Sequence, residues 1–109
     1  MKMIIAVIRP EKFDAVKQAL ADKKYYGMTV TDVYGRGEQR GVCLQYRGKP
    51  ISVDVIQKTE IKLTTCDENA EEVIDIIQKT AYSGKTGDGR IFVVPVEKSI
   101  TIRTGEVFY

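Results

Sequence analysis

One stretch decides how this chain folds, Thr80-Ala-Tyr-Ser-Gly-Lys-Thr-Gly-Asp-Gly-Arg-Ile-Phe92. It joins a segment in which apolar residues recur at regular spacing to an expected strand, and three glycines lie between the two. Gly87 and Gly89 flank Asp88, and Arg90 follows directly. Clustered glycines mark unusual backbone dihedral angles or a close approach of the backbone to another group. Free backbone amides with cations beside them form a concavity suited to phosphate. The stretch is therefore either a phosphate-binding loop or an ordinary glycine-rich surface turn.

The segment before this stretch has the pattern of a helix that packs against a core. Apolar residues recur there at helical spacing, at Ala70, Val73, Ile74, Ile77 and Ala81. Asp67 suits the N-cap, because a carboxylate accepts the free amides at the positive end of a helix. Gly84 is the expected C-terminal stop. Beyond the glycines, residues 91–96 are expected to form a strand, in which Pro95 indicates an edge position or the strand end.

The earlier part of the chain supplies the remaining elements. Residues 2–8 form a continuous apolar run, typical of a strand covered on both faces. Arg9-Pro10 ends it, and an amphipathic helix is expected at 11–23. Residues 28–34 alternate with period two, as a half-buried strand does. In the next expected strand, 56–65, apolar and charged side chains take opposite faces, with Ile61 and Leu63 on one and Lys58, Glu60 and Lys62 on the other.

Strand, helix, strand, strand, helix and strand therefore follow one another along the chain. This order predicts a single α+β domain, residues 1–109, with a ferredoxin-like βαββαβ sandwich whose helices cover one face of the sheet. The other face is left uncovered, so we expect the chain to self-associate. The tail 99–106 alternates as a strand does, and we expect it to pair with a neighbouring subunit.

Two segments between the expected strands do not follow these patterns. Residues 35–41 have GxGxxxG spacing, which misses the dinucleotide-binding fingerprint. Residues 41–53 fit neither an amphipathic helix nor a buried strand. A connection this long in a small domain is usually functional or disordered. We expect a long mobile loop that reaches a partner, and a solvated hairpin is the alternative.

Composition narrows the class of protein. The 109 residues carry a net charge of +2 and 43% hydrophobic side chains, the balance of a soluble globular domain with no electrostatic reason to bind nucleic acid. Histidine is absent, which removes the commonest general base, so we assign no catalytic residue and expect no enzyme. The 2 cysteines lack the spacing of a metal site or a disulfide framework. No apolar run approaches the ~20 residues of a membrane helix. These features fit a reduced cytoplasm.

Five blocks of sequence together resemble the PII signal-transduction proteins, specifically their GlnK-like branch. The blocks are Gly27–Thr31, Gly35–Gln39, Tyr46–Gly48, Thr80–Phe92 and Ile102–Glu106. They lie in register across essentially the whole chain, without an obvious insertion or deletion. A single GxG motif would be weak evidence for this family, but five matching blocks in so short a chain make the resemblance specific.

The resemblance implies a homotrimer with inward-facing sheets, whose clefts between subunits bind ATP or ADP competitively. It defines a mobile T-loop at about 38–54, a phosphate-binding B-loop at about 82–90 and a C-terminal segment at about 98–109. Exposed amides and guanidinium groups are the chemistry that a triphosphate needs. The implied nucleotide-binding residues are Thr29, Gly35 and Thr64 around the adenosine, Gly37, Glu38 and Gln39 near the phosphates, Gly87, Asp88, Gly89 and Arg90 as the phosphate cradle, and Thr101 and Arg103 at positions whose family residues contact phosphate, with Arg103 reaching in from the next subunit.

Family members also bind 2-oxoglutarate at the base of the T-loop when ATP and Mg²⁺ are present. By the same resemblance, Gln39 would ligate the magnesium ion and Lys58 would pair with the distal carboxylate of the effector. Magnesium accepts a single protein oxygen when phosphates supply further ligands. The remaining implied contacts to 2-oxoglutarate are Gly37, Arg40, Gly41 and Gly87.

The resemblance also implies an output. In the family, ADP without 2-oxoglutarate lets the T-loop extend into an ammonium transporter of the Amt family, and Arg47 occupies the position of the arginine that plugs the pore. We therefore expect a cytoplasmic protein that is reversibly recruited to the inner face of the membrane through the transporter. The alternative is the same sensor acting on a soluble enzyme such as glutamine synthetase or nitrogenase. Residues 42–53 would decide between the two.

Several positions depart from the family pattern. Ile51 stands where many bacterial members carry a uridylylated tyrosine, so we expect no such modification at this position. Thr101 replaces an arginine and Glu38 replaces another cationic residue, which weakens the positive field around a triphosphate and puts the ATP/ADP preference in question. Arg90 in place of lysine keeps the charge with a different geometry.

Two other classes of function fit the sequence less well. A nucleotide hydrolase lacks support because Gly84-Lys85-Thr86 has no upstream glycine to complete a P-loop, position 79 being Lys79. A nucleic-acid-binding module would need aromatic side chains stacked on the sheet, and the expected strands do not supply them.

Overall fold

The structure is a computed structural model that describes residues 1–36, 42–46, 49–53 and 55–109, with only the backbone described at 42–46 and 49–53. The elements in chain order are β1 (Lys2–Ile8), the 3-10 turn η1 (Pro10–Lys12), α1 (Phe13–Asp22), β2 (Thr29–Gly35), β3 (Val42–Tyr46), β4 (Lys49–Val53), β5 (Ile56–Thr65), α2 (Asp67–Ala81), β6 (Gly89–Pro95), β7 (Ser99–Ile100) and β8 (Val107–Phe108).

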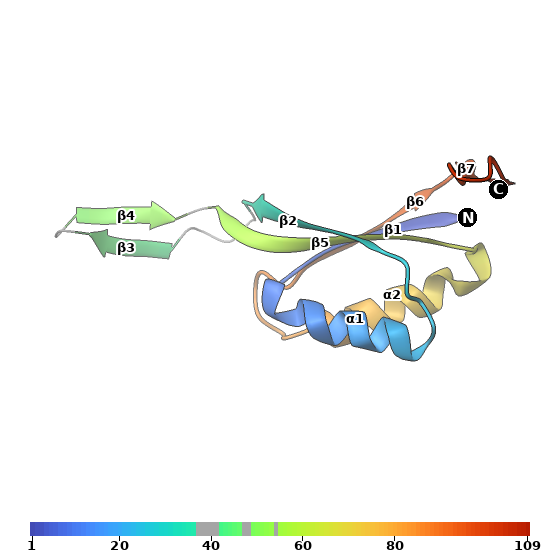
Figure 1. Ribbon diagram of the computed structural model, residues 1–109. Helices are drawn as coiled ribbons and strands as arrows, with labels where there is room; N and C mark the ends of the chain where they lie inside the picture. Colours follow the sequence, from blue (N-terminus) through green and yellow to red (C-terminus); the bar gives the residue numbers. More distant parts are fainter. Residues whose placement is uncertain (37–41, 47–48, 54) are drawn as a thin grey trace.

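One antiparallel sheet carries the fold. Its strand order is β2-β5-β1-β6, and α1 and α2 lie side by side on one face of it (Figure 1). The predicted ferredoxin-like βαββαβ sandwich is therefore confirmed. Strand β6 lies at an edge, where Pro95 costs no ladder hydrogen bond on the solvent side. Neither helix of the described residues has the length and apolarity needed to cross a bilayer.

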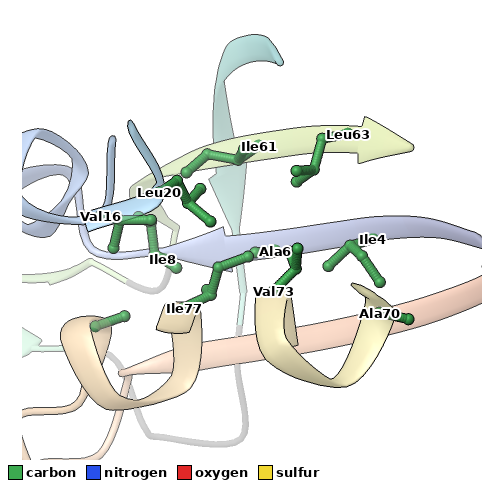
Figure 2. Close-up of a cluster of buried hydrophobic side chains, with 11 residues drawn as sticks. Ile4, Ala6, Ile8, Val16, Leu20, Ile61, Leu63, Ala70, Val73 and Ile77 are labelled. Atoms are coloured by element: carbon green, nitrogen blue, oxygen red, sulfur yellow. The ribbon is translucent and has the colours of Figure 1, made fainter. Parts of the chain in front are cut away.

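The core lies between the sheet and the two helices, as Figure 2 shows. Ala6 pairs with Ile61 on one side and with Ile91 on the other, so these three side chains point toward the helices together. Full burial of an aliphatic side chain stabilises a fold by roughly 1.5–3 kcal/mol, which makes this layer the main source of stability. Among the described residues, the fully buried side chains include Ile4, Ala6, Ile8, Val16, Leu20, Ile61, Val73 and Ile77.

The opposite face of the sheet, called the open face below, has no helix over it (Figure 1). Its apolar side chains come from alternate positions of β1 and β6, namely Met3, Ile5, Val7, Phe92 and Val94. Phe92 is 49% exposed and Val94 40% exposed. The charged positions of β5 lie on the same face, as predicted. The apolar run of β1 was expected to be covered on both sides, but this chain covers only one.

A two-stranded hairpin is inserted between β2 and β5. Strand β3 pairs with β4 in antiparallel register, with Leu44 opposite Ile51. The predicted long connection between the second and third strands of the sheet is confirmed, and its described backbone pairs as the hairpin that the sequence left as the alternative.

The C-terminal tail pairs with itself. The sequence predicted that residues 99–106 would pair with a neighbouring subunit, but β7 pairs with β8 of the same chain. A tight turn joins them, in which Thr101 N donates to Glu106 O at 2.9 Å and Gly105 N to Thr101 O at 2.7 Å. Gly105 has φ 71°, and this left-handed residue reverses the chain. Period-two alternation cannot distinguish a partner within the chain from one in another chain.

The ends of α2 also differ from the prediction. The N-cap is Cys66 rather than Asp67, and the helix ends at Ala81, before Gly84. Asp67 lies in the first helical turn, where its carboxylate forms an ion pair with the Met1 amine at 2.9 Å. That ion pair lowers the pKa of the Asp67 carboxyl.

Candidate functional site

The loop between α2 and β6 folds around a single carboxylate. Asp88 Oδ2 accepts hydrogen bonds from Ser83 N at 2.8 Å and Gly84 N at 2.9 Å. Asp88 Oδ1 accepts the Ser83 hydroxyl proton and the Arg9 Nε proton, the latter at 3.0 Å. The hydrogen bonds from Ser83, followed by those from Arg9 and Gly84, hold the pKa of Asp88 well below its usual range. The carboxylate is therefore the acceptor that shapes this loop.

Glycine is required where the loop meets the sheet. Gly87 and Gly89 have φ 97° and 106°, a region that L side chains rarely adopt. A Cβ on Gly89 would lie 1.8 Å from the carbonyl oxygen of Val7, so a side chain there would collide with the backbone of β1. The loop therefore lies close against β1, where Gly89 is exposed to solvent and Gly87 is half-buried. Phosphate binding by backbone amides needs this kind of access.

Lys58 reaches the loop from the neighbouring part of the sheet. It lies on the open face of β5 opposite Val33, and its ammonium group donates to the carbonyl oxygen of Gly87. Partial burial lowers the pKa of Lys58, and the nearby Arg9 guanidinium lowers it further. Two cations thus lie beside the glycines of the loop, and Asp88 balances part of their charge.

A pocket of about 580 Å³ opens at this end of the open face, which we call the loop end. It lies within the range of volumes typical of small-molecule sites. Basic side chains and loop glycines converge on it, which suits an anion. Its lining includes Gly35, Arg36, Lys58, Gly87, Gly89 and Arg90.

A second hollow, of about 530 Å³, lies at the other end of the open face, which we call the tyrosine end. Its lining includes Tyr25, Tyr26, Thr29, Lys62 and Thr64. Burial raises the pKa of the Tyr25 hydroxyl, and the nearby Glu72 carboxylate adds to that effect. Lys62 Nζ lies 3.3 Å from Glu60 Oε1. Aromatic and apolar walls with polar groups at the rim suit a flat organic ring.

The predicted site residues fall into two groups at these two ends. Gly35, Lys58, Gly87, Gly89 and Arg90 lie at the loop end, together with Asp88, which lies within the loop itself. Thr29 and Thr64 lie at the tyrosine end, and Thr101 and Arg103 lie in the exposed C-terminal turn beyond the same end.

The two ends are too far apart to share one small ligand within the chain. Lys58 and Thr64 lie on β5 and Thr29 and Gly35 on β2, and each pair is about six residues apart along its strand. At ~3.3 Å per residue, these strand segments span about 20 Å. The sequence predicted that Thr29, Gly35 and Thr64 surround one adenosine, and a single chain does not bring these three together.

The other predicted residues lie outside the described residues. They are Gly37, Glu38, Gln39, Arg40, Gly41 and Arg47. Within the described part of the chain, no cluster of three or more acidic or cysteine side chains has the arrangement of a metal site. A magnesium site built on Gln39 stays a prediction.

Two residues of this region were not predicted from the sequence. Arg9 was noted only as part of the break after the first strand, and Ser83 was not singled out. Their contacts with Asp88 join positions 79 and 5 residues apart. For Ser83, a short polar residue beside a glycine, the local pattern is that of an Asx-type or ST-type turn. For Arg9, no local pattern could have found the contact.

Comparison with known proteins places the chain in a family. The sequence profile of the family described as "Nitrogen regulatory protein P-II" matches residues 1–106. "Nitrogen regulatory protein P-II 2" of Methanothermobacter thermautotrophicus is 46% identical over 97% of this chain and 92% of its own length. "Nitrogen regulatory protein GlnK" of Escherichia coli K12 is 44% identical over 97% of this chain and 95% of its own length. "Nitrogen regulatory protein P-II" of Pasteurella multocida is 46% identical over the same shares.

These matches define a class, that of small regulatory proteins of nitrogen metabolism. The chain belongs to the nitrogen regulatory protein P-II family, and it is GlnK-like.

Proposed function

We propose that the protein senses ATP or ADP together with 2-oxoglutarate, in clefts between the chains of a homotrimer, and passes the result to an ammonium transporter. The observation that carries this proposal is the division of the predicted ligand residues between two distant ends of one open face. A site split in this way is completed when the loop end of one chain meets the tyrosine end of the next. Family membership supports the regulatory role.

The loop end has the chemistry for the phosphates. Arg90 and Gly89 are exposed at the pocket, and the half-buried Gly87 also lines it. Guanidinium groups and backbone amides are strong donors to phosphate oxygens. The tyrosine end has the chemistry for the base, because Tyr25, Tyr26 and Met28 supply apolar surface beside the Thr29 hydroxyl.

Arg103 would complete the phosphate site from the neighbouring chain. It lies in the exposed turn between β7 and β8, far from the loop end of its own chain. The adjoining Ile102 is 99% exposed, and an aliphatic side chain in this position suits burial against a second subunit. The apolar side chains of the open face supply the rest of the interface by the same reasoning.

Lys58 would bind the distal carboxylate of 2-oxoglutarate. Its ammonium group is partly buried beside Arg9 and already points at the Gly87 carbonyl. A carboxylate is a stronger partner for an ammonium group than a neutral carbonyl is. Mg²⁺, held by Gln39 and the nucleotide phosphates, would supply the charge that brings the effector and ATP together.

The output would be the position of the segment that contains the β3–β4 hairpin. We propose that ligands favouring one arrangement of this segment shift its population, so that Arg47 enters the pore of an Amt-family transporter in one state and leaves it in the other. A soluble target, glutamine synthetase or nitrogenase, is the competing outcome. Binding of purified protein to transporter-containing membranes, with ADP and with ATP plus 2-oxoglutarate, tests this step. Arg47→Ala should keep nucleotide binding and lose transporter inhibition.

Calorimetry with ATP, ADP and 2-oxoglutarate in all combinations tests the sensing step. Lys58→Ala should lose 2-oxoglutarate binding at least tenfold while ADP affinity changes little, because the ammonium group is assigned to the effector carboxylate and its bond to the Gly87 carbonyl is only one of several that hold the loop. Lys79→Ala, which removes an exposed lysine from α2, serves as the matched control. Equal loss of both ligands in Lys58→Ala would contradict the assignment of this residue. Absence of any nucleotide binding by the wild-type protein would contradict the proposed function.

A further inference from the structure

We infer that Arg9 is a positioning residue, which clamps the loop of residues 82–88 against the end of β1 and so keeps the phosphate-binding glycines in their binding shape. The inference rests on the proposed function, because it assigns the part of the nucleotide site that holds the cradle. Arg9 itself would not contact the nucleotide. It acts through Asp88 and through the backbone of the loop.

Two hydrogen bonds from one guanidinium group form this clamp. Arg9 Nε donates to Asp88 Oδ1 at 3.0 Å, and Arg9 Nη2 donates to the carbonyl oxygen of Thr86 at 2.7 Å. Residues 86 and 88 flank Gly87, so both bonds restrain the backbone at the glycine whose carbonyl oxygen Lys58 contacts. The side chains of Arg9 and Asp88 are each 23% exposed, which protects the ion pair from full screening by solvent.

The chain places Arg9 firmly for this task. Arg9 follows the last residue of β1 and precedes Pro10, and the residue before a proline is restricted to extended conformations. Its φ of −63° and ψ of 137° obey that restriction. The backbone of the donor is therefore fixed from both sides, by the strand before it and by the proline after it. The planar guanidinium group of arginine can donate to two acceptors at once. The ammonium group of a lysine, at the end of a flexible side chain, cannot match that geometry.

Loss of the clamp should weaken binding through the shape of the loop. Without Arg9, the Asp88 carboxylate keeps only its local donors at Ser83 and Gly84. The loop would then hold its own turn but lose its attachment to β1. When only a fraction of molecules has the competent shape, the apparent dissociation constant rises by the inverse of that fraction. A fall of the ordered fraction to about one in ten would weaken both ATP and ADP about tenfold.

The test measures loop order and ligand binding separately. Arg9→Ala, Arg9→Lys and the control Lys17→Ala, which removes an exposed cation from α1, are compared by amide hydrogen exchange without ligand and by calorimetry with ATP and ADP. Arg9→Ala should speed exchange across residues 82–89 and leave α1 and β5 unchanged, with nucleotide affinity about tenfold lower. Arg9→Lys should recover part of both effects. Introducing Arg9→Ala into Asp88→Asn should have a smaller effect than in the wild-type protein, because the ion pair is already lost and the hydrogen bond to the Thr86 carbonyl is the main contact left to remove.

Each possible result either supports the inference or contradicts it. Faster loop exchange together with weaker nucleotide binding, partly rescued by lysine, supports the inference. Unchanged loop exchange in Arg9→Ala, or normal nucleotide binding despite faster exchange, overturns it and leaves the proposed function intact. Wild-type protein that binds neither nucleotide overturns both.

Discussion

The two ends of the open face are built in different ways. At the loop end, side-chain and backbone hydrogen bonds fix the glycine loop within one chain, and Arg9 ties it to β1. At the tyrosine end, the side chains that line the hollow are partly or fully exposed except for Leu63, and the C-terminal turn beyond it is exposed throughout. The first end is preorganised by the chain itself. The second resembles a surface that gains its structure from a neighbour, which agrees with a site shared between subunits.

The comparison predicts that alanine at two left-handed glycines has very different consequences. In Gly89→Ala the new Cβ collides with the backbone of β1, whereas in Gly105→Ala, at the other end, it meets nothing within 4 Å. We expect Gly89→Ala to lower the free energy of unfolding by about 3 kcal/mol or more. Gly105→Ala should cost only the strain of its φ, roughly 1–2 kcal/mol. Urea unfolding of both variants measures the difference, and equal losses would contradict the close contact at the loop end.

The two ends should also differ, by a smaller effect, in how their backbone hydrogen bonds respond to pH. The hydrogen bonds to Asp88 lower its folded-state pKa below the unfolded value of about 3.9, so their contribution to stability is complete above that pH and is lost as the pH falls through the folded-state pKa. The amide signals of Ser83 and Gly84 should therefore stay constant from pH 7 to about pH 4 and move only in stronger acid. In the C-terminal turn, Gly105 N donates to the neutral carbonyl oxygen of Thr101, so that hydrogen bond has no ionisable acceptor.

An Asp88→Asn variant provides the control for this titration by nuclear magnetic resonance. The amide side chain cannot ionise and forms no ion pair with Arg9, so the acid transition of Ser83 and Gly84 should disappear. A transition near pH 4 or above in the wild-type protein would mean that the Asp88 pKa is not lowered, and that the hydrogen bonds do not act as described.

The sequence predicted the sheet and both helices because each has its own periodicity. In β5, Ile61 and Leu63 face the core while the charged residues face away, as the alternation indicated. Features that depend on contacts between distant positions were missed. The Arg9–Asp88 pair spans 79 positions and leaves no local pattern. The alternation of residues 99–106 predicted an extended segment, but only Ser99–Ile100 form a strand and the residues that follow make a turn.

The sequence indicated which residues belong to the candidate site better than it indicated how they are arranged in space. The glycine stretch around Asp88 indicated a phosphate cradle, which stays a prediction, and the structure gives that stretch a loop with left-handed glycines at 87 and 89. The resemblance supplied Thr29, Thr64 and Arg103, which no pattern in the sequence connects with Gly87. Their separation along β2 and β5 became visible only once the strand register was known. That separation is what makes the assembly of several chains part of the proposal.

Subunit mixing tests the shared site most directly. Arg90→Ala disables the loop end and Arg103→Ala disables the tyrosine end, so each homotrimer alone should bind ATP and ADP weakly. In trimers formed from a one-to-one mixture, a cleft between the intact loop end of one variant and the intact tyrosine end of the other is wild type, and about a quarter of all clefts should regain normal affinity. Calorimetry that shows this fraction of tight sites would support the account. A mixture that binds no better than the two separate variants would contradict it.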